Sequence, residues 1–272
     1  MSIKLFFSKI CPQSLRKPAY SVFLKARMLR YHSFLFPSQN VLYCPCCNTR
    51  FRAFNGYDYK EIRSRFNPSR YEHVRQDVLC PICRSLPRHR ILASWCEKNI
   101  DWLRGKRILY FAPEKSMMIW MERNGLKATT ADIKSATDLI LDIQDTGLMD
   151  NSYDVIIANH VLEHVDDFRK ALFEIKRILS PEGCFICSFP MDPKVELLDE
   201  EQEPLTGTER IVRFGQNDHK RVFGMNADQL LSEVGYEVDV IDGDEFPSEI
   251  LPVIGPADYD LNRLFCCRKK GQ

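Results

Sequence analysis

Long apolar runs are missing from this 272-residue chain. No segment approaches the ~20 consecutive apolar residues that a membrane-spanning helix needs. The amino terminus has only a short apolar patch, Leu5–Phe7, before Lys9, which is too short for the apolar part of a secretion signal. Internal repeats and low-complexity segments are also missing. We therefore expect a cytoplasmic globular protein with one large domain and one small domain.

Acidic residues are missing from positions 1–57, which carry nine of the 38 Lys and Arg residues. The remainder then has 29 basic residues against all 37 acids, so a basic head precedes an acidic body. The head could contact an anionic membrane surface, a glycolipid or nucleic acid, or could be a solvated charged segment. Within residues 1–40, Tyr20 to Tyr31 favours a weakly amphipathic basic helix. Because nucleic-acid surfaces are usually broadly basic, the acidic body disfavours a nucleic-acid partner.

Cysteine, in contrast, is plentiful, with 11 residues. In a cytoplasmic protein their spacing is read for metal binding rather than for disulfides. Each Cys-x-x-Cys turn can present two thiolates to one side, so two turns predict a tetrahedral four-sulfur zinc site. Such a site has no open position, and we expect a structural metal. The ligands would be Cys44, Cys47, Cys80 and Cys83, with Cys46 as a spare thiol inside the first turn.

The section after the cysteine pairs alternates strand-like and helix-like stretches. This pattern predicts an α/β fold with a doubly wound, mostly parallel sheet covered on both faces. Its clearest strand, Val155 to Ala158, ends in a polar cluster, and we expect a helix directly afterwards. In such sheets ligands bind at the carboxyl ends of the strands. The polar cluster consists of Asn159, His160, Glu163 and His164.

Glycines are missing where a dinucleotide-binding loop would need them. The first expected strand, 106–111, is followed by Ala112-Pro-Glu114, and Gly-x-Gly-x-x-Gly is required for close approach of a pyrophosphate. The Glu114 carboxylate would suit a cationic ligand. Asp132, at the end of the next expected strand, can accept hydrogen bonds from ribose hydroxyls. Asp142 and the apolar residue after it suit an adenine. Nucleoside features without a phosphate loop indicate S-adenosylmethionine.

An ordered set of motifs resembles class I S-adenosylmethionine-dependent methyltransferases of the type 11 group, over roughly residues 106–190. The motifs are Phe111-Ala-Pro-Glu114, Asp132-Ile133, Asp142, Asp154 to Val165 and Arg177 to Gly183. The paired cysteines and Phe214 to Arg221 also resemble a bacterial subgroup with a cysteine knuckle ahead of the catalytic domain. The family's usual glycine-rich first loop is replaced here by Ala-Pro-Glu.

The resemblance implies a seven-stranded sheet with an antiparallel last strand, joined to a small zinc-ribbon-like amino-terminal domain. The expected divisions are 1–40 for the basic segment, 41–90 for the zinc knuckles and 91–272 for the methyltransferase domain. The expected cofactor-binding residues are Ala112, Pro113, Glu114, Asp132, Ile133, Asp142, Ile143, Asn159 and His160.

The acceptor side is expected to contain a general base, because a hydroxyl acceptor benefits from proton removal. His164 and the pair Asp218-His219 are the candidates. His164 could instead cap or pack at the start of a helix, which Glu163 would support. The Asp218-His219 pair lies in the polar stretch Asp199 to Gly224, expected to be a loop that closes over the site. Anionic acceptors would be held by Arg88, Arg213 and Arg221.

The leading interpretation is O-methylation of a small molecule or a glycan precursor. An RNA methyltransferase that uses the zinc knuckles and basic head is one alternative, although no Asn-Pro-Pro-Tyr-like tetrapeptide follows the fourth strand. A non-enzymatic zinc adaptor that retains the fold is another, and the presence of Asp132 and Asp142 argues against it.

Overall fold

The computed structural model describes residues 41–57, 75–134, 136–191, 194–250 and 262–271. The basic segment 1–40, with its expected helix, lies outside them. Within the described residues no helix is both long and apolar enough to cross a bilayer.

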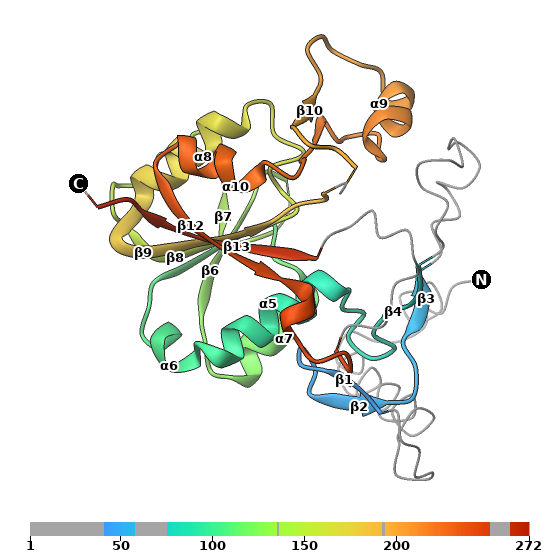
Figure 1. The fold of residues 1–272 in the computed structure, drawn as a ribbon. Coiled ribbons are helices and arrows are strands. Elements are labelled where there is room, and N and C mark those ends of the chain that lie inside the picture. Colours follow the sequence, from blue (N-terminus) through green and yellow to red (C-terminus); the bar gives the residue numbers. More distant parts are fainter. Residues whose placement is uncertain (1–40, 58–74, 135, 192–193, 251–261, 272) are drawn as a thin grey trace, which may run out of the picture.

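A seven-stranded sheet forms the centre of the molecule (Figure 1). Five neighbouring strands are parallel, and β13 runs antiparallel to both of its neighbours. The predicted seven-stranded sheet with an antiparallel last strand is therefore confirmed. In spatial order the strands are β7 (Leu139–Ile140), β6 (Ala128–Asp132), β5 (Ile108–Phe111), β8 (Tyr153–Asn159), β9 (Leu179–Ser188), β13 (Arg263–Lys269) and β12 (Tyr236–Asp242).

Helices cover both faces of this sheet (Figure 1). One face carries α8 (Phe168–Ile178) and α10 (Ala227–Glu233), and the other carries α5 (Pro87–Lys98), α6 (Ile100–Leu103) and α7 (Lys115–Arg123). Each pair of layers encloses its own buried apolar cluster. In α8 the buried positions Phe168, Leu172 and Ile175 recur at helical spacing, so this helix packs as an amphipathic stripe.

Two expectations about the segment after β8 are wrong. The expected immediate helix does not form, because residues 161–167 are turns and α8 begins at Phe168. Glu163 and His164 therefore do not lie at a helix start. The cap of α8 is Asp167, whose carboxylate accepts a hydrogen bond from the Lys170 backbone, whereas Asp166 pairs with Lys220.

The stretch expected to be a loop, Asp199 to Gly224, also contains regular structure. It holds β10 (Asp199–Glu200), α9 (Gly207–Phe214) and β11 (Arg221–Val222). Helix α9 has local signals for both ends: Thr206 and Glu209 form a capping box, and Gly215 ends the helix in the left-handed conformation at φ 92°. These are the preferred residues at such positions.

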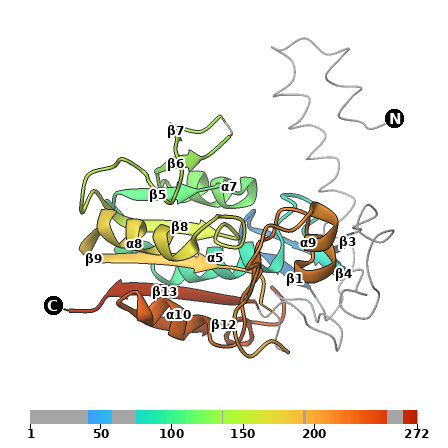
Figure 2. The same cartoon turned by 90° about the horizontal axis from the view of Figure 1, so that it is seen from above.

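The amino-terminal strands form two small antiparallel pairs: β1 (Leu42–Cys44) with β2 (Thr49–Phe51), and β3 (Asn55–Tyr57) with β4 (Arg75–Leu79). Phe51 and Phe54 belong to the same buried cluster as Trp95 on α5. The buried Arg90 guanidinium donates hydrogen bonds to the carbonyls of Val78, Ser85 and Ile250. Figure 2 shows β1, β3, β4 and α9 beyond the carboxyl-end edge of the sheet, where they flank the expected ligand site.

Candidate active site at the carboxyl ends of the strands

The middle of the sheet contains the point where the strand order reverses. The chain proceeds from β5 outward through β6 and β7, then returns to β8 on the other side of β5. In open α/β sheets ligands bind at this point, outside the carboxyl ends of the strands. The ends of β5, β6 and β8 bring Ala112, Asp132 and His160 to the same edge.

Two residues at this edge have backbone conformations that are unusual for side chains other than glycine. Ala112 has a φ of 46° and His160 a φ of 52°. Their amides are held by hydrogen bonds to neighbouring strands, from Ala112 to the Ala131 carbonyl and from His160 to the Ser188 carbonyl. Such local strain concentrates at ligand sites. Ala112 thus adopts the left-handed conformation for which glycine is the usual residue.

Glu114 lies at the amino end of α7 and has close polar neighbours. Tyr110 donates its phenolic hydrogen to the Glu114 carboxylate, His89 Nε2 is 3.2 Å from Glu114 Oε1, and Arg88 Nε is 3.8 Å from it. Burial acts to raise the pKa of Glu114, but the interactions with His89 and Arg88 outweigh burial and lower that pKa. Arg88, expected on the acceptor side, therefore pairs with a residue expected to face the cofactor. Pro113 lies between Ala112 and Glu114 and is partly buried.

The two aspartates expected to hold the nucleoside occupy turns after their strands. Asp132 Oδ1 accepts a hydrogen bond from the Lys134 amide at 2.8 Å. Asp142 accepts bonds from the amide and side chain of Gln144. Their apolar neighbours differ, because Ile143 is buried in the core and Ile133 is 58% exposed. Of these two isoleucines, Ile133 is therefore the one that lies open to solvent.

A side-chain hydrogen bond joins the last residue of β8 to the last residue of β9. Ser188 Oγ donates a hydrogen bond to Asn159 Oδ1 at 3.1 Å, and Asn159 is buried. This bond fixes the position at which the chain turns into His160. The next residues therefore project from a defined point beside the strand-order reversal.

Polar residues from two distant segments meet immediately beyond β8. His160 Nδ1 lies 3.2 Å from Glu163 Oε1, and His164 Nε2 lies 3.9 Å from the same oxygen. The rings of His164 and His219 meet edge to face with centroids 4.8 Å apart. Asp218 Oδ2 is 3.5 Å from His164 Nδ1. The structure thus brings together the three residues expected as catalytic, and it adds Glu163 and His160 to them.

The segment that carries Asp218 and His219 is held to the turn after β8 by hydrogen bonds to main-chain carbonyls of that turn. The Lys220 amide donates to the Glu163 carbonyl at 2.9 Å. Arg221, whose side chain is 1% exposed, donates to the carbonyls of Leu162, Val165 and Asp166. Its Nε also donates to Glu200. Because these donors are used within the protein, the geometry favours a structural role for Arg221 over acceptor binding. Arg213, also expected to bind an acceptor, pairs with Asp199.

We expect Arg221→Met to lower the free energy of unfolding by about 3 kcal/mol, because the change leaves Glu200 and three carbonyls without their donor. Arg213→Met is the matched control, since Arg213 is 38% exposed and a surface ion pair contributes less than about 1 kcal/mol. Urea unfolding of both variants measures the difference. Equal losses in the two variants would contradict the structural role.

A comparison with protein-family models gives the same enzyme class as the fold and the residues at the strand ends. Residues 98–187 match the model of a family described as a methyltransferase domain. The matched stretch includes β5, β6 and β8. The chain therefore contains a methyltransferase domain. The enzyme class predicted from the sequence is therefore confirmed.

Individual proteins similar to the methyltransferase are distant or match only a short stretch. Over 51 residues the chain is 41% identical to the reducing polyketide synthase Preu2 of Preussia isomera. This stretch is 19% of the present chain and 2% of that protein. Two solved structures are the 1,6-didemethyltoxoflavin-N1-methyltransferase of Burkholderia thailandensis (14% identity, TM-score 0.47, 68% of this chain and 79% of that one) and an S-adenosylmethionine-dependent methyltransferase of Archaeoglobus fulgidus (13%, 0.45, 67% and 94%).

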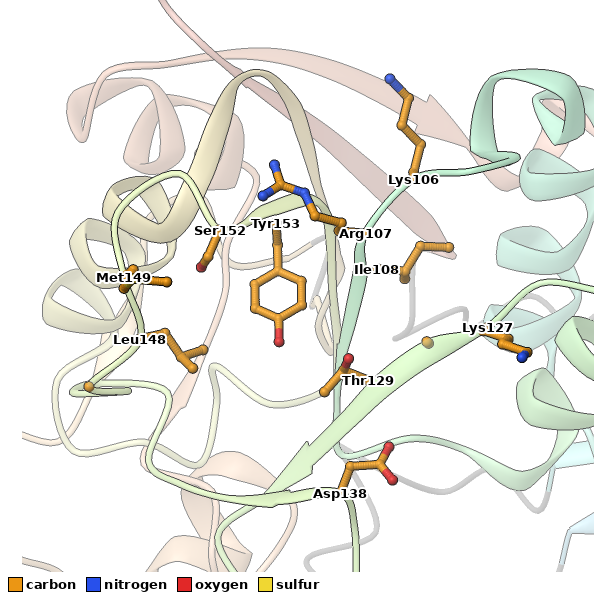
Figure 3. A pocket seen from close by; sticks show the side chains of 12 residues that line it. Lys106, Arg107, Ile108, Lys127, Thr129, Asp138, Leu148, Met149, Ser152 and Tyr153 are labelled. Atoms are coloured by element: carbon orange, nitrogen blue, oxygen red, sulfur yellow. The ribbon is translucent and has the colours of Figure 1, made fainter.

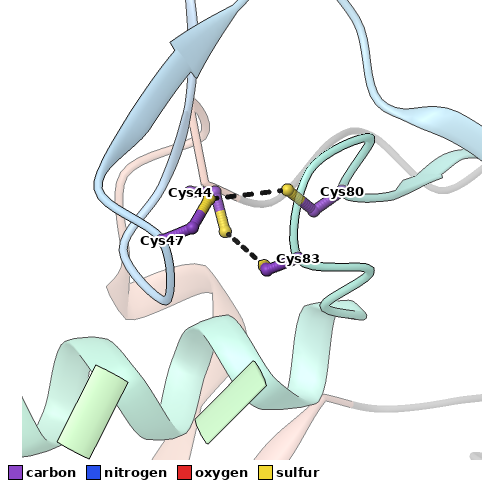
Figure 4. Close-up of side chains that lie close together, drawn as sticks. All are labelled: Cys44, Cys47, Cys80 and Cys83. Carbon is purple, nitrogen blue, oxygen red and sulfur yellow. Dashed lines mark hydrogen bonds between the residues drawn. The ribbon is translucent and has the colours of Figure 1, made fainter. Parts of the chain in front are cut away.

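The cysteine pairs of the methyltransferase converge on one point (Figure 4). Cys44 Sγ is 3.6 Å from Cys83 Sγ, and Cys47 Sγ is 3.8 Å from Cys80 Sγ. All four sulfur atoms lie within 4.8 Å of one another. The Cys46 thiol instead donates toward the His89 carbonyl, so it lies outside this group.

A separate cavity of about 650 Å³ lies near the amino ends of the strands (Figure 3). Ile108, Ala128 and Tyr153, which line it, stand at the starts of β5, β6 and β8. It is therefore at the edge opposite Ala112, Asp132 and His160, and it is not the cofactor site.

Proposed function

We propose that the methyltransferase transfers a methyl group to a hydroxyl oxygen of a small molecule or glycan precursor. The observation that carries this proposal is the group formed by His164, Asp218 and His219 directly beyond the end of β8. Imidazole and carboxylate groups are those that most often assist proton removal from a hydroxyl. An acceptor placed there would lie beside the cofactor edge.

The cofactor would lie across the ends of β5, β6 and β8. Asp132 would accept hydrogen bonds from the ribose hydroxyls, and Asp142 with Ile143 would lie at the adenine. The turn from Ala112 to Glu114 would face the methionine part. The anionic state of Glu114, supported by its lowered pKa, suits the ammonium group of that part. Asn159 and His160 would lie beside the cofactor.

The transfer needs little chemistry from the protein beyond alignment and charge. When bound, S-adenosylmethionine supplies an electrophilic methyl group on a sulfonium sulfur. Bound S-adenosylmethionine would give this methyl group to the acceptor oxygen, and its sulfur would keep the electron pair of the broken carbon–sulfur bond. The hydroxyl proton leaves through the polar group to solvent, which His164 reaches because its side chain is 34% exposed. Holding both partners in line can supply much of the rate.

The cysteine group fits a structural zinc ion. Four sulfurs at about 2.3 Å from a tetrahedral zinc are separated from one another by about 3.8 Å, and the Cys44–Cys83 and Cys47–Cys80 sulfur pairs are 3.6 and 3.8 Å apart. Cys44, Cys47, Cys80 and Cys83 would hold the ion with no open position. The ion would fix the turn that leads into α5, and thereby the Arg88 and His89 side chains that contact Glu114.

We expect His219→Ala to lower turnover by about 100-fold or more, because the acceptor hydroxyl loses one of the groups that assist its deprotonation. Affinity for S-adenosylmethionine should stay within about twofold, since His219 lies outside the proposed cofactor contacts. Turnover is measured by mass spectrometry on a panel of phenols, catechols and nucleotide sugars with a deuterium-labelled methyl donor. Calorimetry measures cofactor affinity.

Asn217→Ala is the matched control, because this exposed residue lies in the same segment and should leave turnover unchanged. Loss of cofactor binding with an unchanged single-turnover rate in His219→Ala would reverse the assigned role. Labelled methyl groups recovered in RNA, and in none of the hydroxyl compounds, would contradict the small-molecule acceptor.

A further inference from the structure

The group beyond β8 contains an arrangement that general base catalysis alone does not use. Ligand atoms of Glu163, His164 and His219 all lie within 4.8 Å of one another. The Glu163 side chain is 1% exposed, with His160 Nδ1 3.2 Å from its Oε1, and buried carboxylates are normally paired or bound to a metal ion. One carboxylate and two imidazoles at a shared point are a known type of ligand set for divalent transition metals.

The hydrogen bonds of the two imidazoles leave the same nitrogen available on each ring. His219 Nδ1 is 3.0 Å from the Phe214 carbonyl oxygen, which can only accept, so Nδ1 carries the hydrogen and Nε2 the lone pair. His164 Nδ1 is 3.3 Å from the Asp218 carbonyl oxygen and faces the Asp218 carboxylate, so its Nε2 also carries the lone pair. Metal-binding histidines typically donate their other ring N–H to such an acceptor.

The segments that carry these three residues are held together by hydrogen bonds within the protein, without a bound ion. Glu163 and His164 belong to the turn after β8, and His219 comes from the segment after α9. The Lys220 amide bonds the Glu163 carbonyl, and Arg221 ties its segment to Leu162 and Val165. Ligands on mutually fastened segments lose little freedom on binding an ion.

We propose that Glu163, His164 and His219 bind one divalent transition-metal ion, whose remaining positions hold the acceptor hydroxyl oxygen. The ligand set favours Mn²⁺, Fe²⁺ or Zn²⁺ over Mg²⁺ or Ca²⁺, because imidazole suits transition metals. Ligand atoms about 2.1 Å from an ion lie about 3 to 3.5 Å apart, so the group closes by roughly an ångström. The ion is the means by which the imidazoles act on the hydroxyl, and this part of the inference rests on the proposed function.

The test uses Mn²⁺ alone as the probe, because thiolates favour softer metals and the cysteine site does not compete strongly for it. Electron paramagnetic resonance titration of the full chain should show one tight Mn²⁺ site. Glu163→Gln and His219→Ala should each weaken it by at least about tenfold. His164→Asn, at a partly exposed position, is the third variant, and it keeps the test decisive if a buried substitution unfolds the protein.

Asp166→Asn is the matched control, since this carboxylate lies in the same turn but pairs with Lys220, and it should retain the site. Failure of the wild-type chain to bind Mn²⁺, or unchanged binding in all three variants, overturns the proposal. The Mn²⁺ titration needs no methyl acceptor. A bound ion together with methyl transfer that is indifferent to it would therefore refute the acceptor role while leaving the site, and a failed O-methylation assay would refute the proposed function alone.

Discussion

Cys80→Ser should lower the free energy of unfolding by more than about 4 kcal/mol, a loss of the size seen when a structural metal is removed. The reason is that zinc-binding energy at such a site is folding energy, because the ligands converge only in the folded state. The cysteine region also shares its buried cluster with Trp95 and Trp120, so its loss removes part of the support for α5 and α7. Guanidinium unfolding measures the change, and elemental analysis of the purified protein measures the zinc content.

Cys46→Ser is the matched control in the same turn. Cys46 is buried, but its thiol is directed at the His89 carbonyl, so the variant should keep one zinc ion per chain and lose only about 1 to 2 kcal/mol. If Cys80→Ser retains both zinc and stability, or if the two serine variants lose equal amounts, the four-sulfur assignment is wrong.

The cysteine variants also test whether the cysteine region supports the proposed cofactor-binding residues. The Leu86 amide donates to His89 Nδ1 at 3.0 Å, so the His89 hydrogen is on Nε2, which faces Glu114. This places the imidazole between the turn that follows Cys83 and the loop after β5. A disordered cysteine region should therefore weaken S-adenosylmethionine binding in Cys80→Ser, even under conditions where the sheet stays folded.

The sheet could be predicted because its strands are encoded locally. Apolar runs such as Val155 to Ala158 and helical spacing such as Phe168, Leu172 and Ile175 are visible without tertiary information. Helix α9 was also encoded locally, by the capping box at Thr206 and Glu209, although composition alone suggested a loop.

The acceptor-side group could not be predicted from the sequence in the same way. His164 and His219 are 55 positions apart, and their contact depends on hydrogen bonds that the Lys220 amide and the Arg221 guanidinium donate to main-chain carbonyls. The same bonds hold residues 161–167 as turns, where a helix was expected. The left-handed conformation of Ala112 was likewise not visible, because alanine carries no signal for it. The structural role of Arg221 was not visible in the sequence either, because the carbonyls that it bonds come together only in the folded turn.

Asp132→Ala should weaken S-adenosylmethionine binding by about 100-fold. A carboxylate that accepts hydrogen bonds from both ribose hydroxyls contributes about 1.5 to 3 kcal/mol for each bond, and part of this is recovered by water in the variant. The fold should be little affected, because Asp132 stands at the partly exposed end of β6. Calorimetric titration with S-adenosylmethionine measures the affinity. The smaller thermal stabilisation of the variant by saturating cofactor gives an independent readout.

Asp138→Ala separates the ribose contact from a general loss of negative charge. Asp138 lies six positions after Asp132, lines the cavity near the amino ends of the strands and accepts hydrogen bonds from the amide and hydroxyl of Thr130, which lower its pKa. Its carboxylate is therefore engaged with β6, and the variant should bind the cofactor as the wild type does. Asp132→Asn should fall between the two, since an amide keeps one acceptor oxygen but loses the charge. Unchanged affinity in Asp132→Ala, or an equal loss in Asp138→Ala, would move the ribose away from the end of β6.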